Sequence, residues 1–122
     1  MINSVNYVRD GELKTSTSVP APTTAEKKAA LHRDMCEFMR TTYIRKNADY
    51  GDSFAALRKE FPQAILLRIG DKYNRLKTLM AKKEALVTDE SLQDTLLDLA
   101  NYCVMELVEM EFDRIKTSEE DL

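Results

Sequence analysis

The sequence predicts an all-α protein, a bundle of three long helices and one short helix. Apolar residues recur with a helical period through most of the chain, glycine is scarce with 3 residues in 122, and no pair of alternating strands stands out. Hydrophobic residues make up 43% and charged residues 32% of the chain, as in an ordinary globular domain. We therefore expect one domain over residues 23–117, preceded by a flexible tail (residues 1–22) and followed by an acidic, frayed end (residues 118–122).

The first long helix is expected to begin after Thr23 and to end near Lys46. Just before it, KTSTSVPAPTT (residues 14–24) is rich in Ser, Thr and Pro and poor in large apolar side chains. Thr23 and Glu26 have the spacing of a capping box, in which the hydroxyl accepts from a backbone amide and the carboxylate reaches back.

A short helix is expected next. The segment KNADYGDS (residues 46–53) interrupts the first helix, with Gly51 at the turn. Asp52 or Ser53 can then cap the short helix, because both side chains accept hydrogen bonds from the free amides of a first turn.

The second and third long helices follow. Pro62 suits the first turn of a helix over residues 62–82, where its missing N–H is not needed. After a turn, Thr88 or Asp89 is expected to cap a third long helix that runs to about Ile115.

One stripe of this third helix carries acids and then apolar residues. At about 100° per residue, four polar side chains fall within roughly 80° of one another: Glu90, Asp94, Asp98 and Asn101. The same stripe continues with Met105, Val108 and Phe112. A separate stripe is expected to face solvent: Ser91, Thr95, Tyr102, Glu106, Glu109 and Asp113. Apolar residues lie opposite it: Leu92, Leu96, Leu99, Cys103, Leu107 and Met110.

Because the acidic stripe becomes apolar, we expect its carboxylates to face inward; a solvated acidic face is the alternative. Inward-facing carboxylates must be paired, protonated or bound to a metal. Glu90, Asp94 and Asp98 have a spacing that suits Mg²⁺, which takes one or two carboxylates and fills its shell with water and phosphate. The sequence therefore predicts catalytic Mg²⁺ ligands at these three positions, with Asn101 as a further ligand or a contact to a base or sugar.

The second long helix carries a complementary polar stripe: Arg68, Asp71, Lys72 and Arg75. The three basic side chains can bind phosphate, and arginine offers a bidentate fork. A structural alternative is equally open, in which Arg68 and Arg75 pair with Asp94 and Asp98 and so join the two helices.

The interrupting segment adds three candidate nucleotide contacts. Lys46 can meet a phosphate, Asp49 can act as a ligand or base, and Tyr50 offers a ring on which a nucleobase can stack. A capped loop without function is the alternative.

Three segments together resemble the nucleotide-modification-associated domain family of phages and bacteria: KNADYGDSF, RIGDKYNRL and DESLQDTLLDLANY. The resemblance covers roughly residues 30–108. It implies a phage-type protein that acts on nucleotides and is linked to nucleotide or DNA-base modification.

The chain is more remotely similar to the all-α nucleoside triphosphate pyrophosphatases of the MazG and helical dUTPase type. Those enzymes hold Mg²⁺ between an E-x-x-E on one helix and an E-x-x-D on the next, and the acids of the third helix could stand in for the second element. The first element is missing, because the second helix offers only Asp71 among basic residues. Asp34 and Glu37 on the first helix are three residues apart and match the E-x-x-E element only weakly. This departure favours nucleotide binding over hydrolysis.

Three functions therefore stay open: a Mg²⁺-dependent nucleotide pyrophosphohydrolase, a module that binds a nucleotide such as a defence signal without cleaving it, and a structural interaction protein. Residues 88–122 carry a net charge of −9 and residues 1–87 carry +6, which argues against a protein that binds duplex nucleic acid.

No apolar run is long enough for a membrane span, and no secretory signal is recognisable. Cys36 and Cys103 fit helical apolar patterns, so we expect reduced core thiols in a cytoplasmic protein. The wide apolar arcs of the long helices predict a homo-oligomer.

Overall fold

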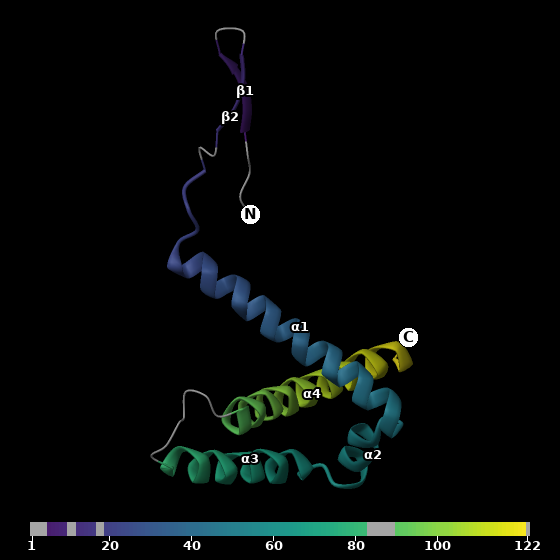
Figure 1. The fold of residues 1–122 in the computed structure, drawn as a ribbon. Coiled ribbons are helices and arrows are strands. Elements are labelled where there is room, and N and C mark those ends of the chain that lie inside the picture. Colours follow the sequence, from purple (N-terminus) through teal and green to yellow (C-terminus); the bar gives the residue numbers. More distant parts are fainter. Residues whose placement is uncertain (1–4, 10–11, 17–18, 83–89, 122) are drawn as a thin grey trace. The chain divides into compact units, whose positions relative to one another are not determined.

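The computed structural model describes residues 5–9, 12–16, 19–82 and 90–121. By their contacts these residues form two compact units, residues 1–38 and residues 39–122. Four helices lie in the described parts of the chain (Figure 1), so the predicted all-α class with three long helices and one short helix is confirmed.

The first unit adds an element that the sequence analysis did not predict. Strands β1 (Val5–Arg9) and β2 (Glu12–Ser16) pair antiparallel, with Val5 opposite Ser16 and Arg9 opposite Glu12. In the sequence these strands are separated by an Asp-Gly pair, which is typical of two-residue hairpin connections. The flexibility expected of residues 1–22 stays a prediction.

Helix α1 (Thr24–Tyr50) begins at the predicted capping box. The Thr23 hydroxyl oxygen accepts from the backbone N–H of Glu26 at 3.1 Å, and the hydroxyl donates to the Glu26 carboxylate at 3.1 Å. The helix runs one turn beyond the predicted end at Lys46. It stops where Gly51 adopts a left-handed φ of 60° and the Asp52 N–H bonds back to the Asn47 carbonyl, as in a Schellman ending.

Helices α2 (Ser53–Glu60) and α3 (Ala64–Ala81) follow, and their N-terminal ends agree only in part with the prediction. Asp52 occupies the N-cap of α2, but its φ of 59° is left-handed and its side chain makes no capping hydrogen bond. Pro62 lies before α3 rather than in its first turn, because Gln63 is the N-cap residue.

Helix α4 (Glu90–Glu120) packs along α3, and the two form an antiparallel helical hairpin (Figure 1). It continues past the predicted end near Ile115. The predicted caps, Thr88 and Asp89, lie outside the described residues. No helix in the described ranges is both long and apolar enough to cross a lipid bilayer.

Few side chains are fully covered within one copy of the chain. Among the described residues, Leu79 on α3 is the buried hydrophobic side chain, at 7% exposure, and Thr95 on α4 is the buried polar one, at 2%. Both cysteines are free as predicted, but the expectation that they lie in the core is wrong, because Cys36 and Cys103 are exposed. The hairpin of α3 and α4 therefore depends on a small buried centre.

Truncation of Leu79 tests this centre. We expect Leu79→Ala to lower the free energy of unfolding by about 2–4 kcal/mol, since a buried leucine loses both its transfer energy and its packing. Leu67→Ala is the matched control, because that leucine on the same helix is 76% exposed. Its change should stay within about 0.5 kcal/mol in urea denaturation. Equal losses in the two variants would contradict a centre at Leu79.

Candidate functional site

The face of α4 that turns toward α3 is the one expected to face solvent. Thr95 is fully buried, and Tyr102 and Glu106 are half-buried. The prediction of a solvent stripe through these residues is therefore wrong. The neighbouring apolar stripe of α4 includes Leu96 at 48% and Leu107 at 62% exposure. A helical wheel separates these stripes but does not tell which one a neighbouring polar helix covers.

Three polar contacts join α3 to α4 in antiparallel register, and we call them the seam. The Arg75 Nε donates to the Thr95 hydroxyl oxygen at 3.1 Å. One turn earlier on α3, the Lys72 ammonium pairs with the Asp98 carboxylate at 3.2 Å. One turn earlier still, the Arg68 guanidinium lies 5.6 Å from the centroid of the Tyr102 ring.

The seam corrects the predicted partners of the basic stripe. The stripe does meet α4, as the structural alternative held, but Lys72 rather than an arginine pairs with Asp98. Arg75 uses a hydroxyl instead of a carboxylate. Thr95 also donates to the Ser91 carbonyl at 2.6 Å, so its hydroxyl accepts a hydrogen bond from α3 and donates one within α4.

The predicted carboxylate trio does not converge. Glu90 and Asp94 are exposed, so the prediction that they face inward is wrong; only Asp98, with a side chain 42% exposed, lies against a neighbouring helix. The described ranges contain no group of three or more His, Cys, Asp or Glu placed to hold a metal ion. The roles of Glu90, Asp94 and Asp98 as catalytic Mg²⁺ ligands therefore gain no geometric support and stay a prediction.

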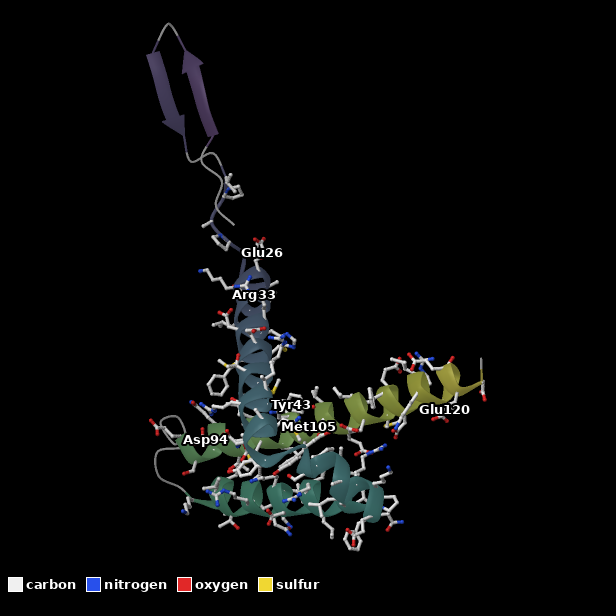
Figure 2. All side chains as sticks on the ribbon, turned by 90° about the vertical axis from the view of Figure 1, so that its right-hand side faces the viewer. Glu26, Arg33, Tyr43, Asp94, Met105 and Glu120 are labelled. Carbon is white, nitrogen blue, oxygen red and sulfur yellow. The ribbon has the colours of Figure 1, made fainter. Side chains whose placement is uncertain are left out.

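A pocket of about 240 Å³ opens beside the seam, within residues 39–122. All four helices line it: Tyr43, Lys46, Asn47 and Tyr50 from α1, Ser53, Phe54 and Leu57 from α2, Arg68 from α3, and Asp98, Asn101, Tyr102 and Met105 from α4. Five of the ten predicted site residues are among them: Lys46, Tyr50, Arg68, Asp98 and Asn101. In Figure 2, Tyr43 and Met105 mark the crossing of α1 and α4 at this pocket, whereas Asp94 lies toward the N-terminal end of α4.

The charge of the pocket is positive although the whole chain carries −3. Its one acid, Asp98, is neutralised by Lys72. Within the described part of the chain, Lys46 and Arg68 form no ion pair with a carboxylate. Two cations thus face the pocket without a neutralising partner.

The pocket also has an aromatic wall. The rings of Phe54 and Tyr102 lie 6.3 Å apart between centroids with an interplanar angle of 28°, and Arg68 covers Tyr102. Tyr50 is 69% exposed and leaves its ring open at the mouth. These groups offer flat surfaces on which a planar ligand can stack.

The remaining predicted residues have other positions. Lys72 and Arg75 act in the seam, and Asp49 is exposed and outside the pocket lining. Asn101 lines the pocket, but its amide donates to the Met39 carbonyl oxygen at 3.3 Å and so ties α4 to α1.

A second hollow, of about 600 Å³, involves residues that sequence reasoning missed. Arg58 of α2 lines it and bridges Glu106 at 2.9 Å and Asp113 at 2.7 Å on α4. The second carboxylate oxygen of Glu106 is buried and has no hydrogen-bond partner among the described groups. The clue in the sequence is the heptad-like recurrence of Thr95, Tyr102, Glu106 and Asp113, which includes an uncharged threonine and an aromatic ring among the acids.

The acids around Arg58 perturb one another. Loss of solvent raises the pKa of Glu109 above its usual value, and Asp52 raises it further, while Arg58 acts in the opposite direction. Loss of solvent also raises the pKa of Tyr43, with smaller contributions from Asp52 and Glu109. Ionised Glu109 is therefore disfavoured in the folded chain relative to the unfolded one.

Glu109→Gln tests whether ionised Glu109 destabilises the folded chain. Because the folded pKa of Glu109 is raised, its contribution to stability is full below its unfolded pKa and is lost as the pH rises through the folded pKa. We expect Glu109→Gln to melt at a higher temperature than the parent at pH 7, with the difference vanishing toward about pH 4.

Glu111→Gln is the control with the opposite sign, since Arg114 lowers the pKa of Glu111 through a hydrogen bond. Its melting temperature should be unchanged or lower at pH 7. Calorimetry of both variants across this pH range gives the answer, and a lower melting temperature for Glu109→Gln at pH 7 would contradict an unfavourable ionised Glu109 in the folded chain.

Comparisons with known proteins give one match. No curated protein and no solved structure matches the chain. The resemblance to the all-α pyrophosphatases is thus not confirmed. The profile of the family described as Nucleotide modification associated domain 1 matches residues 46–110, a span that contains all three seam contacts and most of the pocket lining. The chain belongs to this family.

Proposed function

We propose that the protein binds a nucleotide in the pocket beside the seam, with the phosphates at Lys46 and Arg68. The observation that carries this proposal is the pair of cations without carboxylate partners at the edge of an aromatic pocket. The family description, which associates the domain with nucleotide modification, points to the same class of ligand.

The positive charge of the pocket favours anionic ligands over cationic ones. Lys72 already neutralises Asp98, so an anion entering the pocket meets two positive charges and no competing negative one. A phosphate can take a bidentate contact from the Arg68 guanidinium and a point charge from the Lys46 ammonium.

The size and wall of the pocket favour a nucleobase as the other part of the ligand. A volume of about 240 Å³ is modest for a small-molecule site, so the pocket suits one base with its sugar rather than a dinucleotide. Tyr50 is exposed enough to close over a base, and the half-buried Tyr102 and Phe54 form a fixed wall. Asn47 and Ser53 supply polar groups that can select among base edges.

Binding is the core of this proposal, and turnover is a separate matter. A Mg²⁺-dependent pyrophosphohydrolase, a module that sequesters a nucleotide signal, and a cytoplasmic location remain expectations of the sequence. The first two differ in one observable, which is the fate of the nucleotide after binding.

Titration calorimetry with nucleoside mono- and triphosphates, with and without Mg²⁺, tests the proposal. We expect Lys46→Ala and Arg68→Ala each to weaken binding by about 10- to 100-fold, the loss of one charge-assisted contact. Lys77→Ala is the control matched in charge, because Lys77 lies over Tyr73 at 4.8 Å and outside the pocket.

Binding that is absent, or that all three variants retain equally, would contradict the proposal. Chromatography of the nucleotides recovered from the Mg²⁺ samples separates the two versions. Monophosphate with pyrophosphate identifies the enzyme, and intact triphosphate identifies the binding module.

A further inference from the structure

We propose that a second copy of this chain packs antiparallel against the outer stripe of α4, which consists of Leu96, Cys103, Leu107 and Met110. These side chains are exposed, with Leu96 at 48%, Leu107 at 62% and Met110 at 54%. At about 100° per residue they lie within roughly 60° of one another, and the centre of this stripe is about 115° around the helix from the centre of Thr95, Asp98 and Tyr102.

The spacing of the outer stripe is that of a helix-packing surface. Its members follow one another at seven, four and three residues, the pattern with which two helices interlock side chains over several turns. The first charged residue to interrupt the stripe is Arg114, whose Nε donates to the Glu111 carboxylate at 3.0 Å and which is therefore already neutralised.

A partner is required because one copy covers so little apolar surface. Leu79 is the buried hydrophobic side chain of the described residues, whereas α4 alone exposes seven large ones, among them Val104 and Ile115 at the borders of the stripe. The stripe with these two borders leaves on the order of 500 Å² of apolar surface. A stable interface takes about 800 Å² from each partner, of which roughly 60% is apolar.

The partner that fits this surface is a second copy, because the stripe is symmetric about Cys103. Leu96 lies seven residues before Cys103 and Met110 seven residues after it. In an antiparallel pair with its two-fold axis at Cys103, each Leu96 meets the partner's Met110, and each Arg114 lies across from an aliphatic residue, the partner's Leu92. No like charges meet along this contact, whereas a parallel pair would bring Arg114 against Arg114.

Disulfide formation at the axis is the sharpest test. Axes about 8–10 Å apart bring facing Cα atoms to roughly 5 Å, within the range of a disulfide. In the full chain with Cys36→Ser, mild oxidation should convert most of the protein to a covalent dimer on a non-reducing gel. The further substitution Cys103→Ser should abolish the dimer band.

The direction of packing is tested on the chain without native cysteines. Leu96→Cys alone and Met110→Cys alone should not link to themselves, whereas a refolded mixture of the two should give a covalent heterodimer. Self-linking of Leu96→Cys would show a parallel pair and overturn the antiparallel arrangement.

The mass in solution provides the independent measurement. Sedimentation should give twice the chain mass of 14.0 kDa, or a multiple of it, for the parent. Leu107→Glu should lower this mass at least by half, while Leu67→Glu on α3, a more exposed site outside the stripe, should leave it unchanged. A parent that sediments as a monomer overturns the proposal, as does a dimer in which Cys103 does not link. If Leu107→Glu fails to fold, the oxidation experiments on the parent decide.

Discussion

The polar seam between α3 and α4 is the interaction on which the rest of the structure depends. Lys72–Asp98, Arg75–Thr95 and Arg68–Tyr102 lie at successive turns of an antiparallel hairpin, so one contact fixes the register of the next. A partly exposed ion pair contributes little by itself. Its value here is in specificity: a shift of one turn would leave the buried Thr95 hydroxyl and the Arg75 guanidinium without each other.

The charge of the candidate site depends on which group of α4 each basic residue of α3 contacts. Three basic residues on α3 reach α4, and among the residues that the structure describes only Lys72 of these three pairs with an acid. Arg75 donates to the neutral hydroxyl of Thr95, and Arg68 lies over the Tyr102 ring at the pocket wall. Local neutralisation thus leaves a positive pocket in a chain that is acidic overall. Net charge describes the whole surface, whereas ligand choice depends on the few groups that remain unpaired at the site.

The sequence predicts where the helices lie but not which face of each helix packs against its neighbours. Capping, a left-handed glycine and apolar period are local properties, which is why α1 begins where Thr23 and Glu26 place it and ends at Gly51. Five pocket residues on α1, α3 and α4 were also identified, since helices that pack together in a small domain bring their polar segments close to one another. The outward direction of Glu90 and Asp94 was not predictable, because it depends on which stripe of α4 packs against the basic face of α3. In the structure the basic face of α3 packs against the stripe of α4 that carries Thr95, Asp98 and Tyr102.

This packing has a structural consequence for α4. An amphipathic helix ordinarily turns its apolar arc toward its own chain and its polar arc toward water. Here the arc through Thr95, Asp98 and Tyr102 is used within the chain, so the arc through Leu96 and Leu107 is left outside. Exposure of an apolar surface of this size to water is unfavourable. A partner that covers it would therefore stabilise α4 in the orientation that the seam requires. Since Asp98, Asn101 and Tyr102 line the pocket from that same helix, assembly along the outer stripe and order in the pocket should be linked.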